Sequence, residues 1–171
     1  MTLKNLFPFF LFLFLLVFSA CSSPVTLSPQ GHETNQGSVA WTLPADQCPS
    51  LPAGLEVSGT GEHSSVTNTK LMANGSTKVV TNDLAKGSAI DSNGNTYHFI
   101  YQNHSTQVIN GSVTQIEMKD SFILNGRGSA TRLNVGFLWR WSFPTGEDPF
   151  FEFNNWEQLS TRGDPLHCDP L

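Results

Sequence analysis

Alternation of apolar and polar side chains is the strongest structural signal in the chain. From Leu133 to Phe143 every second residue is a large apolar one, and most residues between them are polar or small. The same period of two runs through two earlier segments, at Tyr97, Phe99 and Tyr101, and at Ile116, Met118, Phe122 and Leu124. A period of two is typical of a β-strand that buries one face. No segment shows a helical period of comparable quality.

Four Asn-Gly pairs separate the alternating segments, at 74–75, 93–94, 110–111 and 125–126. Both central residues of a type I′ hairpin turn need positive φ, which Asn and Gly accept. We therefore predict four hairpins in series and five antiparallel strands. Near the C-terminus, Phe150, Phe151, Phe153 and Trp156 could supply a further strand that covers an edge.

Long strands in a meander must bury one face and protect their edges. The sequence thus predicts an all-β fold: an antiparallel up-and-down meander of long strands that closes into a small β-barrel or forms a curved sheet or sandwich.

The N-terminus has a different pattern. Lys4 precedes an apolar run from Leu6 to Ala20 that ends in small residues, which is the layout of a secretory signal peptide. The run is short for a membrane span, which needs about 20 apolar residues.

Phe18-Ser19-Ala20-Cys21 resembles the lipobox of bacterial lipoproteins, although Phe18 stands where Leu is usual. The resemblance covers only the first two dozen residues. It implies cleavage before Cys21, acylation of that cysteine, and a protein anchored by lipid on the extracytoplasmic side of the cell membrane or the outer membrane. The alternative is ordinary cleavage beside a cysteine that is not modified.

Three regions follow from this interpretation. We expect residues 1–20 to be a cleaved signal peptide, 21–46 a flexible tether rich in Ser, Pro, Thr and Gln, and 47–171 a single β domain. With Cys21 acylated, Cys48 and Cys168 remain as a pair that export would oxidise to a disulfide. The alternative is two reduced, buried thiols.

Charge and motifs exclude several function classes. Removal of Lys4 with the signal leaves 8 basic against 14 acidic residues, a balance that does not suit nucleic acid. The five histidines lack metal spacing, and no phosphate loop, dinucleotide fingerprint or Gly-x-Ser-x-Gly elbow occurs. We therefore predict no cofactor, no metal and no catalytic residue.

Two-residue turns at the first three Asn-Gly pairs align one row of inward side chains across the sheet. The final hairpin continues that row through a four-residue loop, Gly126 to Ser129. The row is His63, Lys86, Tyr101, Asp120 and Val135. Ionisable groups on an otherwise aromatic face are unexpected unless they are paired or hydrated. A bulge at Lys86-Gly87 is the alternative, and it would turn Lys86 outward and make a Tyr101 to Asp120 hydrogen bond purely structural.

Three functions fit these features. The first is a non-catalytic module that binds a small, partly apolar ligand through His63, Lys86, Tyr101 and Asp120. The second is a structural or adhesive envelope protein that meets another protein or a glycan. The third is a barrel isomerase or cyclase that uses Lys86, Tyr101 and Asp120 as acid and base groups.

Overall fold

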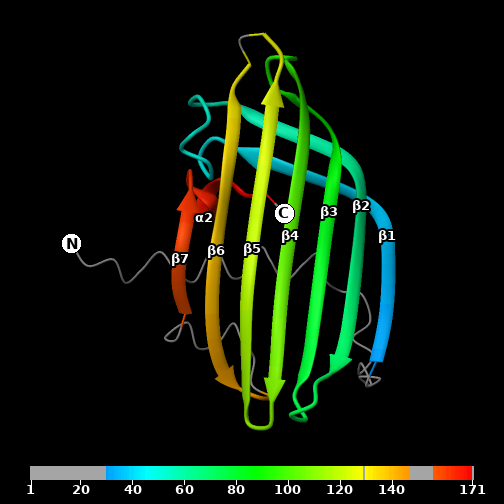
Figure 1. Cartoon of the computed structure of the whole chain (residues 1–171). Coiled ribbons are helices and arrows are strands. Elements are labelled where there is room, and N and C mark those ends of the chain that lie inside the picture. The colour runs from blue at the N-terminus through cyan, green and yellow to red at the C-terminus, as the bar shows by residue number, and fades with distance from the viewer. Residues whose placement is uncertain (1–29, 129, 147–155, 171) are drawn as a thin grey trace, which may run out of the picture.

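The computed structural model describes residues 30–128, 130–146 and 156–170. The elements in chain order are β1 (Gln30–Pro44), β2 (Glu56–Leu71), β3 (Thr77–Asp91), β4 (Thr96–Asn110), β5 (Val113–Gly126), β6 (Arg132–Pro144), β7 (Trp156–Arg162) and the single-turn helix α2 (Pro165–Cys168). Each strand pairs antiparallel with the next, so the order in the sheet is the order in the chain (Figure 1). The predicted all-β meander is confirmed.

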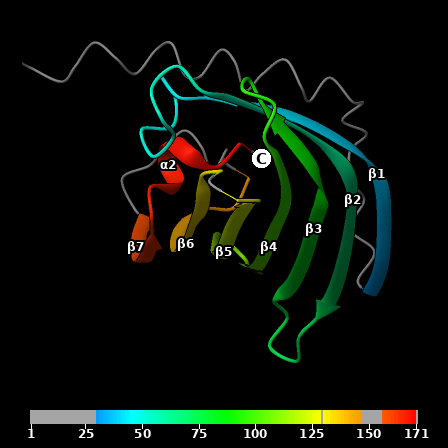
Figure 2. The same cartoon turned by 90° about the horizontal axis from the view of Figure 1, so that it is seen from above.

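The sheet is curved and open. Strands β1 and β7 form its two edges, and the described strands do not close into a barrel. Seen from above, the sheet curls around a concave side, and the C-terminal segment with α2 lies inside the curl (Figure 2). Of the two architectures that the sequence left open, the curved sheet is therefore observed. The possible strand at 150–153 lies outside the described residues, while β7 begins at Trp156.

The prediction of a tether over 21–46 was wrong from residue 30 onward. Residues 30–44 form β1, which pairs with the whole length of β2. The segment is mostly polar because both faces of this edge strand are exposed over most of its length. Its apolar residues come late, and Trp41 and Leu43 enter the core. Cys21 and the predicted signal peptide lie outside the described residues.

All four predicted hairpins form, but not with type I′ turns, because no residue other than glycine has positive φ in the described chain. At the first two pairs the loop has three residues, 73–75 and 92–94. The amide N–H of Gly75 donates to the Met72 carbonyl and that of Gly94 to the Asp91 carbonyl. This is a type I turn followed by a left-handed glycine. The third hairpin has a two-residue loop, 111–112, with Gly111 as its first residue.

The core occupies one end of the concave face. Late in β1 and early in β2 the strands turn and cross this end of the sheet (Figure 1). Trp41 thereby reaches strands that are not its neighbours, with its ring edge-on to Phe99 at 5.2 Å and to Phe122 at 5.4 Å between centroids. The loop 45–55 adds Leu51 and Leu55 to the same core.

Three glycines permit this turn of the strands. Gly59 lies directly opposite Trp41, and a Cβ at Gly59 would overlap the indole ring. Gly61 lies opposite Gly87, and a Cβ on either would overlap backbone atoms of the facing strand. Because backbone cannot move aside as a side chain can, only glycine lets β2 fold this closely over β3.

We expect Gly87→Ala to lower the free energy of unfolding by about 3 kcal/mol, at the upper end of the usual cost of overpacking. Gly37→Ala is the matched control, because a Cβ there meets nothing within 4 Å. It should be neutral or stabilise by about 0.5 kcal/mol, since glycine is unfavourable within a strand. Urea unfolding of both variants measures this, and equal effects of the two substitutions would contradict the close approach of β2 and β3.

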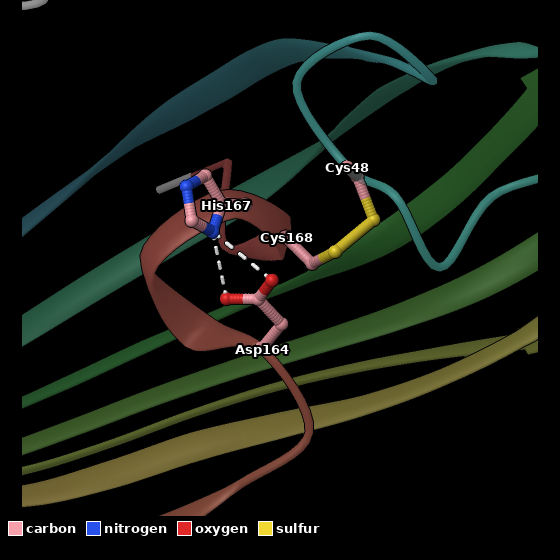
Figure 3. The surroundings of a disulfide bond; sticks show 4 residues. All are labelled: Cys48, Asp164, His167 and Cys168. Carbon is pink, nitrogen blue, oxygen red and sulfur yellow. Dashed lines mark hydrogen bonds and ion pairs between the residues drawn. A yellow bond between two sulfur atoms is a disulfide. The ribbon is translucent and has the colours of Figure 1, made fainter. Parts of the chain in front are cut away.

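A disulfide joins the two ends of the domain. Cys48 in the loop 45–55 is bonded to Cys168 at the end of α2, with a sequence separation of 120 residues (Figure 3). Both cysteines are fully buried. Beside the bond, the Asp164 carboxylate and the His167 ring contact one another across the single turn of α2, at 2.9 Å from Oδ1 to Nδ1. The predicted pairing of Cys48 with Cys168 is confirmed.

A buried carboxylate organises the loop between β3 and β4. Asp91 accepts hydrogen bonds from the backbone N–H groups of Asn93 and Asn95, from the Asn95 side chain, and from the Tyr97 hydroxyl at 2.7 Å. Burial alone would raise the pKa of Asp91, but these hydrogen bonds outweigh it and lower that pKa below its ordinary value. Burial and the adjacent Asp91 carboxylate raise the pKa of Tyr97 to about 12.

These shifts predict losses of stability at both ends of the pH scale. The lowered pKa of Asp91 contributes stability above the unfolded value of about 4, which is lost as the pH falls through the folded value. The raised pKa of Tyr97 contributes stability below pH of about 10, which is lost as the pH rises toward 12. Urea unfolding at different pH values measures both effects. The difference in free energy of unfolding between wild type and Asp91→Asn should become smaller in acid. The difference between wild type and Tyr97→Phe should become smaller in alkali. Differences that stay constant across pH would contradict the assignment.

Candidate functional site

The register divides the strand residues between two faces. Odd-numbered residues of β1, β2, β3, β4 and β6, and even-numbered residues of β5, lie on the concave face, and the others lie on the convex face. Within the described chain, the hydrophobic core cluster covers the end of the concave face near the disulfide. The other end, which we call the far end, lies toward the turns at 72–76 and 110–113 and carries polar and aromatic side chains, among which Thr114 and Phe143 are buried. The candidate site lies between the two ends.

The predicted row of side chains does not form. Tyr101 lies opposite Phe122 rather than Asp120, and Lys86 lies opposite Glu62 and Ile100. Lys86 is exposed on the convex face. It borders a shallow hollow of about 610 Å³ there, on the side of the sheet away from Tyr101. The ladders on both sides of β3 run without a bulge at Lys86-Gly87, so loop length and not a bulge turns Lys86 outward.

Three of the four predicted ligand residues do lie on the concave face. His63, Tyr101 and Asp120 come from β2, β4 and β5. His63 and Tyr101 belong to one cross-strand row, which passes through Ala85 between them and ends at Phe122 and Val135. Asp120 belongs to the next row toward the far end.

This next row is polar from one edge of the sheet almost to the other. Its members are Asn35, Ser65, Asp83, Asn103, Asp120 and Phe137. Asn35 and Ser65 also line a polar hollow of about 550 Å³ near the β1 edge. Sequence reasoning missed Asp83 and Asn103. The alternation within β4 already placed Asn103 on the same face as Tyr101, which was the available signal.

Hydrogen bonds connect the two rows at Asp120. The Tyr101 hydroxyl donates to Asp120 Oδ2 at 2.6 Å, and Asn103 Nδ2 donates to the same oxygen at 2.8 Å. Asp120 is 5% exposed, yet its other oxygen, Oδ1, is buried and accepts no hydrogen bond within the described chain. A buried carboxylate oxygen without a donor is costly. The site therefore has an unused acceptor.

Negative charge accumulates around Tyr101. Burial raises the pKa of the Tyr101 hydroxyl, and the carboxylates of Asp120, Asp169 and Asp83 raise it further. Asp83 also contacts His63, with 3.6 Å between Asp83 Oδ1 and His63 Nε2. Tyr101 therefore stays protonated and acts as a hydrogen-bond donor. We call His63, Asp83, Tyr101, Asn103 and Asp120 the concave polar cluster.

An aromatic pair adjoins the concave polar cluster. Phe137 lies directly opposite Asp120, and its ring stacks on Trp139 at 4.1 Å between centroids with 23° between the planes. Both side chains are partly exposed. Carboxylates beside a half-exposed aromatic surface can hold a small molecule that is polar at one end and apolar at the other.

Within the described residues no group of three or more His, Cys, Asp and Glu side chains could hold a metal ion. In the described part of the chain, no helix is long and apolar enough to cross a membrane. No protein-family model, curated protein or solved structure was found to match the chain.

Proposed function

We propose that this protein binds a small, partly apolar ligand on its concave face without turning it over, and that it does so while anchored by lipid to the cell envelope. One observation carries the binding proposal: the buried, partly unsatisfied Asp120 carboxylate directly opposite a half-exposed aromatic pair. A purely structural buried carboxylate would have hydrogen-bond donors on both of its oxygens.

The ligand residues of this proposal are His63, Tyr101 and Asp120, joined by Asp83, Asn103 and the aromatic pair. Lys86 is left out because it lies on the other face. The same separation weakens the isomerase or cyclase alternative, which needs Lys86, Tyr101 and Asp120 in one place.

A screen of small molecules by thermal unfolding tests the binding proposal. A ligand present at 100 times its Kd stabilises a protein by about 2.7 kcal/mol, which is a readily measured shift in Tm. We expect at least one compound to raise the Tm of wild type and of Ile100→Ala, an exposed convex-face variant, but not that of Phe137→Ala. Compounds that stabilise Phe137→Ala as much as wild type, or a screen without any stabilising compound, would refute binding at this site.

The anchor proposal rests on the resemblance of residues 18–21 to a lipobox. If Cys21 is acylated, nine residue steps separate it from Gln30, the start of β1, and the two lie at most roughly 30 Å apart. Gln30 pairs with Lys70 at the end of the sheet opposite the disulfide. The far end of the concave face would then be the end nearer the membrane.

Intact-mass analysis tests the anchor. The full chain is expressed in a bacterium and extracted with detergent, beside a Cys21→Ala variant. We expect the wild-type mass to match a chain that begins at an acylated Cys21 and lacks two hydrogens at the disulfide. An uncut N-terminus or an unmodified Cys21 would overturn the anchor and leave the binding proposal to be judged by the screen.

A further inference from the structure

Charged side chains are sorted between the two faces of the sheet. Within the described strands, every lysine lies on the convex face: Lys70, Lys78, Lys86 and Lys119. The strand arginines lie there as well: Arg132, Arg140 and Arg162. The concave face of these strands therefore has no lysine or arginine to balance its acids.

The acids of the concave face gather near the candidate site. Asp83 and Asp120 lie in the polar row, Glu33 lies one row further toward the far end, and the charge of Asp169 acts on Tyr101. Among the described side chains that can carry a positive charge, His63 contacts this group, through Asp83. A face with several carboxylates and no permanent positive charge attracts cations and repels anions.

The hydrogen-bonding pattern specifies what kind of cation fits. Asp120 Oδ2 already accepts two hydrogen bonds, whereas Asp120 Oδ1 is buried and lacks a donor. The missing partner must carry an N–H or O–H group, and a positive charge on that donor makes the hydrogen bond stronger. The aromatic pair beside Asp120 offers a surface for an apolar body and for the cation itself.

We infer that the concave face binds an organic amine in its protonated form, with the ammonium group on Asp120 and Asp83 and the apolar part on Phe137 and Trp139. This inference rests on the proposed binding function and narrows it to one ligand class. The ammonium supplies the donor that Asp120 Oδ1 lacks, and the negative face compensates the charge of the bound molecule.

Three probes with one aromatic body and different charge test the ligand class: 2-phenylethylammonium, 2-phenylethanol and phenylacetate. Calorimetric titration of the purified protein should give an affinity for the ammonium at least about tenfold above that for the alcohol, as expected for a charged hydrogen bond. Phenylacetate should bind more weakly still. Added salt should weaken the binding of 2-phenylethylammonium and leave the binding of 2-phenylethanol unchanged.

Variants on one strand locate the effect. Asp120→Asn should lower the affinity for 2-phenylethylammonium at least about tenfold and leave the affinity for 2-phenylethanol within about twofold. Glu117→Gln is the matched control, a convex-face carboxylate on the same strand that pairs with Arg140, and should change neither affinity. If Asp120→Asn does not fold, the half-exposed Asp83→Asn variant should lower the ammonium affinity in the same direction.

The outcomes separate this inference from the proposed function. Equal affinity for ammonium and alcohol, tighter binding of phenylacetate, or ammonium binding that survives both Asp120→Asn and Asp83→Asn would overturn the ligand class while a concave binding site stands. No binding of any probe would also overturn the ligand class, and the thermal screen with its Phe137→Ala variant would then decide the proposed function separately.

Discussion

Replacing both Cys48 and Cys168 with alanine is expected to lower the free energy of unfolding by about 4 kcal/mol. The disulfide closes a loop with a sequence separation of 120 residues, and in the chain-entropy model such a loop contributes about 4 to 5 kcal/mol by constraining the unfolded chain. Typical domains have only about 5 to 15 kcal/mol of stability in total. The double variant should therefore retain the fold with a small margin of stability.

Urea unfolding followed by circular dichroism measures this loss. Wild type with its disulfide reduced is the matched comparison and should unfold at nearly the same urea concentration as the double variant. The native fold should persist in both at low urea, because the sheet ladders do not include either cysteine. A difference below about 1 kcal/mol between oxidised and reduced protein would show that the bond does not secure the C-terminal segment against the loop 45–55.

Trp41→Ala is expected to cost about 3 to 5 kcal/mol, the usual range for removing a large aromatic side chain from a core. Trp41 is the contact through which β1 closes over the strands opposite, because its ring meets both Phe99 and Phe122. Without the indole ring, the space that it fills beside Gly59 is left empty. Ser38→Ala, on the exposed convex face of the same strand, is the control and should change stability by less than about 0.5 kcal/mol.

A second variant distinguishes packing from polarity at this position. The Trp41 indole N–H donates to no acceptor within the described chain, so Trp41→Phe removes an unsatisfied donor together with part of the ring volume. It should recover more than half of the stability that Trp41→Ala loses. If Trp41→Ala costs no more than Ser38→Ala, β1 does not close over the core.

The sequence correctly predicted which side chains of β4, β5 and β6 lie on the concave face. It did so because the predicted and observed registers of these strands differ by an even number of residues. The loop after Asn110 and the loop after Gly126 each shift the pairing by two residues from the predicted one. A shift of two keeps every side chain on its face. Phe99, Tyr101 and Asp120 therefore lie where alternation placed them, although Asp120 lies opposite Phe137 instead of Val135.

Lys86 was misplaced because the loops on both sides of β3 have three residues and not two. Each extra residue shifts the register by one, which moves a strand's side chains to the opposite face. The two errors cancel at β2, so His63 lies on the predicted face while Lys86 does not. Asn-Gly permits both loop types, and the choice depends on whether Asn takes positive φ, which the sequence does not reveal.

Strand β1 was missed for a different reason. Its first half carries polar side chains on both faces, so it has neither the alternation of a half-buried strand nor the apolar content of a buried one. Only its backbone pairing with β2 makes it a strand. Val39, Trp41 and Leu43 do alternate, and this was the available signal, but it covers only the end of the strand and does not extend to its polar first half.

The central claim is that the concave polar cluster, and not the convex face, receives the ligand. Side-chain amide signals in NMR spectra test it most directly during a titration with 2-phenylethylammonium. The Asn103 amide donates to Asp120 on the concave face, whereas the side chains of Asn68 and Asn82 are bonded to His32 and His104 on the convex face. We predict that the Asn103 signals shift in proportion to bound ligand while those of Asn68 and Asn82 stay in place. Shifts of the Asn68 or Asn82 signals with a static Asn103 would contradict the claim.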